Sequence, residues 1–450
     1  MTQRARRPGG QSIFWEAPSD VSSTRLYFIW LLVAIFFEYA RPASFVPGLD
    51  ALKPYSLLPA SLFLIVSFSS NRALRPWSDM FSDPLAKWIC IYVALIFLSI
   101  THAPVTTQAF EMFTVAVGYV IYFFLILRIV VTRGRLLGVF FTLLVAHLFL
   151  VVMNPQFVLD PSNRYYIIGA TFLGDTNDYT LSLCILAPMV IELALQQRSM
   201  LLKVFFWFVL VVIGLAIVSS QSRGAALGIS AVLIYLWLIS PRKMLTLTGF
   251  VLLAGVMLLY ASDAFFERMS TIKDYEQEGS AMGRITAWKA AVEMVLDHPI
   301  LGVGSGHFSI TFGTSYMPRD IVGPYPWLTA HSIYFLILAE LGIPGIVTLL
   351  VLIFGNMRTN SRIRRTVLDQ SPDQISEQHK SGARTLYLLN ASMVGFAVAG
   401  AFLSAAYYPH IYVLTALMIV QRREIMNGLK LDLTKSAPIR RRRPATARPA

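Results

Sequence analysis

Long apolar runs separated by short polar segments dominate the chain. Apolar stretches of about 15–22 residues recur from end to end, and this is the length that a helix needs to cross the bilayer core. The predicted spans are 26–40, 55–70, 85–101, 113–132, 136–153, 178–196, 203–219, 225–240, 244–262, 331–355, 385–406 and 409–421. The pattern therefore predicts an all-α polytopic membrane protein with about 12 transmembrane helices.

The organisation that follows has five parts. A tail at 1–25 precedes spans one to nine at 26–262, a large loop occupies 263–330, spans ten to twelve cover 331–421, and a basic tail fills 422–450. The first run begins near Leu26 and passes Glu38 without a small-residue cleavage site. We therefore expect a retained first span and not a removed signal peptide.

The large loop departs from the short connections elsewhere. Its segment "AMGRITAWKAAVEMVLDHP" has helical spacing and predicts an amphipathic helix near the membrane surface. The expected apolar face is Ile285, Trp288, Val292, Val295 and Leu296. Pro299 and the glycine-rich "GVGSGHF" should end this helix in a turn, where His307 is expected at the surface.

Composition and charge agree with a membrane protein. Hydrophobic residues make up 56% of the chain and charged residues 14%, whereas soluble domains carry roughly 25% charged residues. The net charge of +13 does not indicate nucleic acid as a partner, because Arg and Lys gather in alternate loops and at both ends. The positive-inside rule then predicts cytoplasmic termini and a periplasmic large loop. The arginines of Arg440–Arg443 are expected to meet anionic membrane lipids.

Three basic residues are expected on the outer face. Arg223 lies in the turn between spans seven and eight, Arg284 opens the amphipathic helix, and His331 opens span ten. Arginine donors suit a phosphate or diphosphate, and histidine suits proton transfer near neutral pH. The alternatives are an arginine that reaches lipid headgroups, a solvated helix residue and a hydrogen-bonded structural histidine.

Other polar residues have weaker functional interpretations. Asp175 and Asn177 either cap the outer start of span six or form part of a polar binding lip. Gly304 and Gly306 lie in a turn that resembles a phosphate loop but lacks its lysine.

Two polar residues fall within predicted spans. His147 is expected to make a hydrogen bond between helices. Glu340 lies nine residues beyond His331, roughly 13 Å along a helix, so it needs a basic or hydroxyl partner from another span. Cys90 and Cys184 fall inside apolar runs and are expected in the core without a disulfide. No metal-binding spacing or nucleotide motif is present, so neither a metal nor a cofactor is expected.

Three fragments carry a family resemblance. "SRGAALG", "GRITAWKAAVEMVLDHPILGVGSGHF" and "AHSIYFLILAELGIPGIV" resemble, in order and spacing, the signature of the O-antigen ligase and O-antigen polymerase superfamily. The resemblance spans roughly Gly174 to Val351. The segments "ERMSTIKDYEQEGSAMGRITAW" and "AHSIYF" look most like the O-glycosylation ligase-like branch associated with exosortase systems.

The resemblance implies a metal-independent glycosyltransferase of the bacterial inner membrane. Such an enzyme moves a glycan from a polyprenyl diphosphate, such as undecaprenyl diphosphate, to an acceptor hydroxyl on the periplasmic face. The acceptor is the lipid A core in lipopolysaccharide ligases, a second lipid-linked glycan in polymerases, and a Ser or Thr of a protein in O-oligosaccharyltransferases.

The family's functional residues match three positions of this chain. Its diphosphate-binding arginines fall on Arg223 and Arg284, and its essential histidine falls on His331. Ser332 stands where ligases often have Asn, and Ser305 and His307 occupy a turn where Pro or Asn is common. These departures bear on the acceptor more than on the reaction.

Two other functions remain open at this point. A polymerase would use the same donor, and a transporter of lipid-linked oligosaccharides would share the membrane architecture. Transporters usually show repeats with broken helices in matched halves, and the chain has no counterpart of the large loop in its first half.

Overall fold

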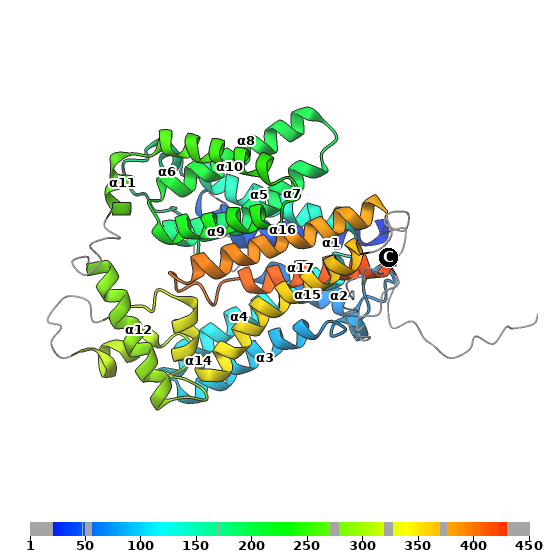
Figure 1. Cartoon of the computed structure of the whole chain (residues 1–450). Coiled ribbons are helices and arrows are strands. Elements are labelled where there is room, and N and C mark those ends of the chain that lie inside the picture. Colours follow the sequence, from blue (N-terminus) through cyan, green and yellow to red (C-terminus); the bar gives the residue numbers. More distant parts are fainter. Residues whose placement is uncertain are drawn as a thin grey trace, which may run out of the picture.

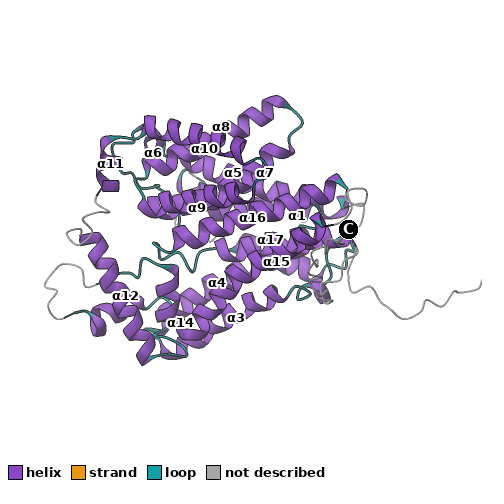
Figure 2. Cartoon of the chain, in the orientation of Figure 1, coloured by secondary structure: helices purple, strands orange, loops and turns teal. Residues whose placement is uncertain are grey.

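The computed structural model describes residues 21–46, 48–49, 56–169, 172–270, 279–318, 327–369 and 376–429. These residues form helices and loops without a strand (Figure 2). The longer helices are α1 (Arg25–Ala40), α2 (Leu57–Phe68), α3 (Pro84–Ser99), α4 (Thr106–Ile129), α5 (Arg133–Met153), α7 (Thr176–Gln196), α8 (Met200–Ser219), α9 (Arg223–Ile239), α10 (Lys243–Tyr260), α14 (Ile333–Leu350), α15 (Asn356–Leu368), α16 (Glu377–Gly400) and α17 (His410–Leu429). The prediction of an all-helical fold is confirmed.

Every predicted span coincides with a helix, but the helices differ in how readily they could cross a bilayer. Within the described residues, eight are long and apolar enough: those at Ser22–Ala40, Pro84–His102, Thr106–Ile129, Arg133–Met153, Thr176–Gln196, Met200–Ser219, Lys243–Tyr260 and Ile333–Leu368. Two shorter apolar helices are α2 and α9. These helices make the chain a multi-pass membrane protein.

Helices α16 and α17 are not among these eight because their sequences are more polar. Their packing against other helices explains why polar residues are tolerated there. Helix α16 lies against α7, α9, α15 and α17, and α17 also packs against α4 and α5. Several of their polar side chains are buried and hydrogen-bonded; Asn390, for example, accepts from Asn360 Nδ2 at 2.8 Å. Protein, not lipid, surrounds these two helices, so polar residues with partners are tolerated. Helix α10, in contrast, buries no residue and faces outward.

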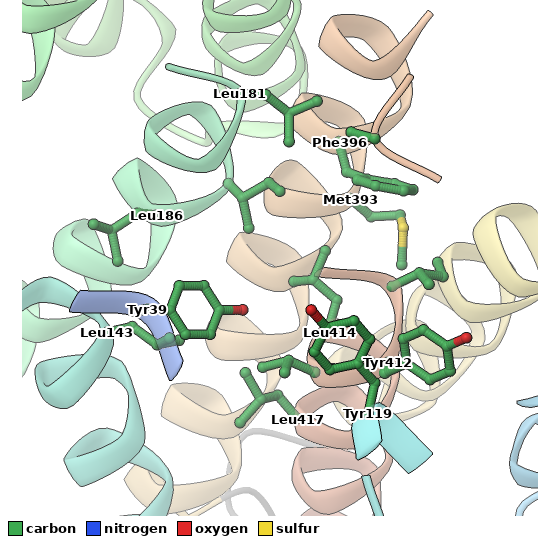
Figure 3. Packing of buried hydrophobic residues seen from close by; sticks show 14 of the residues in the cluster. Tyr39, Tyr119, Leu143, Leu181, Leu186, Met393, Phe396, Tyr412, Leu414 and Leu417 are labelled. Carbon is green, nitrogen blue, oxygen red and sulfur yellow. The ribbon is translucent and has the colours of Figure 1, made fainter. Parts of the chain in front are cut away.

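The core is a continuous apolar cluster where the first and last helices meet α5 and α7 (Figure 3). Tyr39 of α1 and Leu414 of α17 lie within it, close to Leu143 and Leu186. The predicted interhelical bond of the mid-span histidine is confirmed, because His147 Nε2 lies 2.7 Å from Ser182 Oγ of α7.

The cysteine prediction is confirmed in part. Cys184 is buried beside the Ala225 carbonyl, whereas Cys90 is half-buried, and both are free thiols.

One end of the bundle is held by buried ion pairs, and we name it the Glu192 end. Glu192 at the end of α7 binds Arg133 at 2.6 Å and Arg384 at 3.1 Å, from the starts of α5 and α16. Arg422 near the end of α17 binds Asp83 beside α3 at 2.8 Å. In these pairs an opposite charge lies beside each buried charge, which offsets the cost of desolvation.

The opposite end, where α7, α9 and α14 begin, is named the His331 end. It carries the connection from α10 to α14, which contains α11 (Asp263–Ser270), α12 (Gly279–Asp297), α13 (Phe308–Thr311) and the π-helical turn η6 (Phe312–Tyr316). Figure 1 shows α11 and α12 at this end, far from α2. Residues 271–278 and 319–326 of the connection, and the predicted lipid contact of Arg440–Arg443, lie outside the described residues.

Helix α12 confirms that the predicted segment is helical, but part of its expected apolar face is wrong. Val292 and Leu296 are exposed, whereas Ala287, Ala291 and Met294 are buried. The reason is the close packing of α12 on α14, which small alanine side chains permit. The buried face of α12 therefore differs from the expected one, because the expectation counted only large apolar residues and left out the alanines.

A break in α14 shapes the rest of the connection. Pro344 lacks an N–H and disfavours a regular turn, and Gly342 has non-helical backbone angles (φ +67°). The carbonyls freed at Ala339 and Glu340 accept hydrogen bonds from Val303 N–H (2.9 Å) and Gly304 N–H (3.2 Å). The glycine-rich turn thus docks into the broken helix and satisfies its backbone, as a buried break requires.

Candidate functional site at the His331 end

His331 lies two residues before α14 in a left-handed backbone conformation (φ +44°), which is uncommon for a residue other than glycine. Its N–H donates to Ser404 Oγ at 2.9 Å, and the preceding Ala330 carbonyl accepts from Trp288 Nε1 at 2.9 Å. The backbone at Ala330 and His331 is therefore held from two sides, by α12 and by the segment after α16. His331 is only partly buried, so its side chain is accessible to a substrate.

Arg284 is placed beside His331 by α12. Trp288, one helical turn after Arg284, stacks on Phe335 of α14 with ring centroids 5.1 Å apart. This contact and the bond to Ala330 dock α12 on the start of α14. Burial lowers the pKa of His331, and the positive charge of Arg284 lowers that pKa further, so the imidazole is neutral at pH 7.

Asp175 is the second charged group near His331. It caps α7 by accepting the Asn177 N–H at 2.7 Å, which confirms the capping interpretation for Asp175; the Asn177 side chain does not cap the helix but donates to the Asp175 carboxylate at 2.7 Å. Its negative charge raises the pKa of His331 and so opposes the other two effects. Arg164 Nη2 lies 3.7 Å from the Asp175 carboxylate, and Arg164 Nε donates to Thr176 Oγ1 at 2.8 Å.

Arg223 is the first residue of α9 and lies at the same end of the molecule. The turn before it is tight: Gln221 has φ +53°, and Ser222 Oγ caps α9 by accepting from the Ala225 N–H. The next residue, Gly224, lies against Phe402, where an added Cβ would be 3.1 Å from Phe402 Cβ. The segment after α16 thus packs against the Arg223 turn and also bonds to His331.

Glu340 has the hydroxyl partner that its position predicts. Its carboxylate accepts from Tyr407 Oη at 2.7 Å, from Gly306 N–H at 2.8 Å and from Phe308 N–H at 2.8 Å. Gly304 and Gly306 therefore direct their N–H groups at α14, and a contact with substrate phosphate stays a prediction.

His307 is a correction to the sequence analysis, because it is fully buried and not at the surface. Its Nε2 accepts from the Val105 N–H at 3.2 Å, and its Nδ1 lies 2.8 Å from the Ser305 carbonyl. Since an amide N–H can only donate, the proton of this neutral ring is on Nδ1. Ser332 is also buried, at the N-cap position of α14, without a side-chain capping bond.

Four residues near the site escaped the sequence analysis: Arg164, Ser404, Tyr407 and Tyr408. Tyr408 Oη donates to Asp178 Oδ2 at 2.9 Å, which ties the segment after α16 to the first turn of α7. The sequence offered only a weak signal for them, namely a polar "YYPH" and one arginine in a loop otherwise poor in basic residues.

Two further observations concern ligands. No group of three or more His, Cys, Asp or Glu side chains that could hold a metal ion occurs within the described part of the chain. A small cavity of about 20 Å³ lies among Tyr39, His147, Ser182 and His410, and none of the predicted site residues lines it.

The comparisons with known proteins bear on the same segment. A comparison with curated proteins found no match. A family model described as O-antigen ligase matches residues 208–350, about a third of the chain. The matched segment contains the two arginines, the histidine, the glycine-rich turn and Glu340, but not Asp175 or the segment after α16. Over this segment, the chain, a multi-pass membrane protein, is similar to the O-antigen ligase family, and this match supports the resemblance to the O-antigen ligase superfamily.

Proposed function

We propose that the protein transfers a glycan from a polyprenyl-diphosphate carrier to an acceptor hydroxyl at the His331 end. The observation that carries the proposal is the grouping of His331 with Arg284 and Asp175, whose charges act on its imidazole. Helix α9 begins with Arg223 at the same end of the bundle. The O-antigen ligase match supports an enzyme of the ligase or polymerase kind.

The chemistry assigns a role to each of these side chains. A bond forms between the acceptor oxygen and the anomeric carbon, and the bond from that carbon to the diphosphate oxygen breaks. Arg223 and Arg284 stabilise the negative charge that builds on the departing diphosphate. His331 takes the proton of the attacking hydroxyl, for which a neutral imidazole is required. Attack opposite the leaving group inverts the anomeric carbon.

The proposal includes twelve spans and an orientation in the bacterial inner membrane. Both termini lie in the cytoplasm, and the His331 end faces the periplasm. The support is the charge distribution, because the Glu192 end gathers Arg133, Arg384, Arg422 and Arg423. Positive residues of membrane proteins are enriched on the cytoplasmic side.

Deleting the gene and analysing the cell's glycans tests the function and identifies the acceptor. A ligase predicts loss of glycan-capped lipopolysaccharide, a polymerase predicts loss of long-chain polymer, and a protein O-glycosylation enzyme predicts loss of glycoprotein. In each case the lipid-linked glycan should accumulate, and the wild-type gene, but not the His331→Ala variant, should restore the product. Unchanged glycans and no accumulated donor would contradict the proposal.

A further inference from the structure

The connection between α16 and α17, residues 401–409, bonds to three separate parts of the His331 end. Ser404 Oγ accepts the His331 N–H at 2.9 Å, and Tyr408 Oη donates to Asp178 of α7 at 2.9 Å. Between them, Tyr407 Oη donates to the buried Glu340 carboxylate at 2.7 Å. This short segment, which lies outside the residues matched by the O-antigen ligase model, therefore joins α7 and α14.

Ser404 is the member of this connection that reaches His331 directly. Besides the His331 N–H, it forms a 2.6 Å hydrogen bond with Thr329 Oγ1. The hydroxyl thus holds residues on both sides of Ala330, whose own carbonyl is bonded to Trp288. The side chain of Thr329 and the backbone of Ala330 and His331 are thus held shortly before α14 begins.

This bracing matters because the His331 backbone is strained. A left-handed conformation costs a residue other than glycine roughly 1–2 kcal/mol, and His331 has φ +44°. Such a conformation persists only where the surroundings enforce it, and it is common at functional sites. A regular helical start would aim the imidazole in a different direction from the one seen here.

The anchor of the connection is itself rigid. The Glu340 carboxylate that binds Tyr407 also accepts two backbone N–H groups of the glycine-rich turn. Tyr92 Oη of α3 donates to the Ala406 carbonyl at 3.2 Å. A movement of Ser404 away from His331 would therefore require several buried hydrogen bonds to break, each of which is costly to leave unmade.

We propose that Ser404 is a positioning residue that holds His331 in register with the acceptor hydroxyl, through a connection that Tyr407 anchors to Glu340. The proposal rests on the proposed function, in which His331 takes the acceptor proton. Misplacing a catalytic group by about 1 Å can cost up to 100-fold in rate. Loss of the Ser404 hydroxyl should therefore lower kcat much more than it changes the KM for the lipid-linked donor.

The test uses the full-length protein in lipid vesicles with the lipid-linked glycan of the deletion strain as donor. Per folded molecule, the Ser404→Ala variant should lose roughly 10- to 100-fold in kcat with little change in KM. Ser404→Cys, which keeps a weak acceptor of similar size, should retain more activity. Thr329→Val is the matched control, because it removes a bond to Ser404 but leaves the Ser404–His331 bond in place.

The pH profile separates positioning from general destabilisation. An imidazole released from its position loses the burial and the Arg284 charge that lower its pKa, so the acidic limb of the kcat profile should move to higher pH. A purely structural defect would reduce the folded fraction and leave the limb where it is. Asp175 is the other charge acting on His331, and its effect is the smallest of the three.

The outcomes distinguish this inference from the proposed function. If His331→Ala is inactive while Ser404→Ala has the wild-type kcat and pH profile, the positioning role is wrong and the proposed function stands. Full activity of His331→Ala would contradict both. A loss in Ser404→Ala matched by an equal loss in Thr329→Val, without a shift of the acidic limb, would also overturn the positioning role.

Discussion

At the scale of single residues, the site depends on how burial and two charges set the protonation state of one imidazole. Burial and Arg284 lower the pKa of His331, and Asp175 raises it. Since the net effect is a lowered pKa, the imidazole stays neutral and able to accept a proton at pH 7. Activity should fall only when the pH drops through this lowered pKa.

Asp175→Asn tests this balance. The substitution removes the charge that raises the pKa of His331 and keeps a side chain that can cap α7, since Asn and Asp are comparable N-caps. The acidic limb of kcat/KM should therefore move to lower pH, which a pH–rate profile measures. Asp160→Asn is the control, because Asp160 lies in the same loop and its own contacts are Asn163 and Tyr165. A shift of the limb to higher pH in Asp175→Asn would contradict the account.

The sequence predicts some of these residues and not others, for a physical reason. Arg223, Arg284 and His331 stand out because positive or titratable groups are costly near an apolar span. Ser404 and Tyr407 do not stand out, because a hydroxyl group at a helix end costs little free energy and is common. These two residues matter because they contact residues 67 to 73 positions away in the chain. The periodicity of apolar residues in the sequence does not reveal such contacts.

At the scale of elements, the broken helix α14 and the glycine-rich turn form one unit. Residues Pro344 and Gly342 free backbone groups that the turn then satisfies. The sequence indicates a glycine-rich turn after α12, but it predicts span ten as one continuous helix at 331–355, without the break at Gly342 and Pro344. That the two fit together follows only from tertiary packing, as does the alanine-rich face of α12.

Gly302→Ala tests the docking of the turn. An added Cβ would lie 2.3 Å from the Ala339 carbonyl oxygen, at a φ of +62°, so the turn must move off α14. We expect a loss of about 2–3 kcal/mol in stability and lower transfer activity, measured by thermal unfolding in detergent and by the transfer assay. Gly283→Ala is the matched control, because its Cβ would have no neighbour closer than 3.8 Å. Equal stability of the two variants would be evidence against the docking role.

At the scale of the whole molecule, the chain separates the buried ion pairs of the Glu192 end from the proposed site at the His331 end. The apolar pattern predicted a helix for every span, and the structure has one at each range. The polar composition of α16 and α17 becomes intelligible only in three dimensions, where other helices surround them.

Single-cysteine labelling tests the orientation of the two ends. In a background with Cys90→Ser and Cys184→Ala, a membrane-impermeant maleimide should label Tyr166→Cys in intact spheroplasts, because Tyr166 is exposed in the loop before α7. Arg198→Cys, beyond the other end of α7, should react only after permeabilisation. The reverse pattern would place the His331 end in the cytoplasm and exclude a periplasmic donor.

The central claim is that His331 takes the proton of the acceptor hydroxyl during glycan transfer. The most direct measurement adds purified protein to membranes of the deletion strain, which hold both the accumulated donor and the free acceptor, and follows the glycan onto the acceptor. The account predicts transfer by the wild type and a loss of about 100- to 10,000-fold for a folded, membrane-inserted His331→Ala variant. Transfer by that variant at the wild-type rate would contradict it.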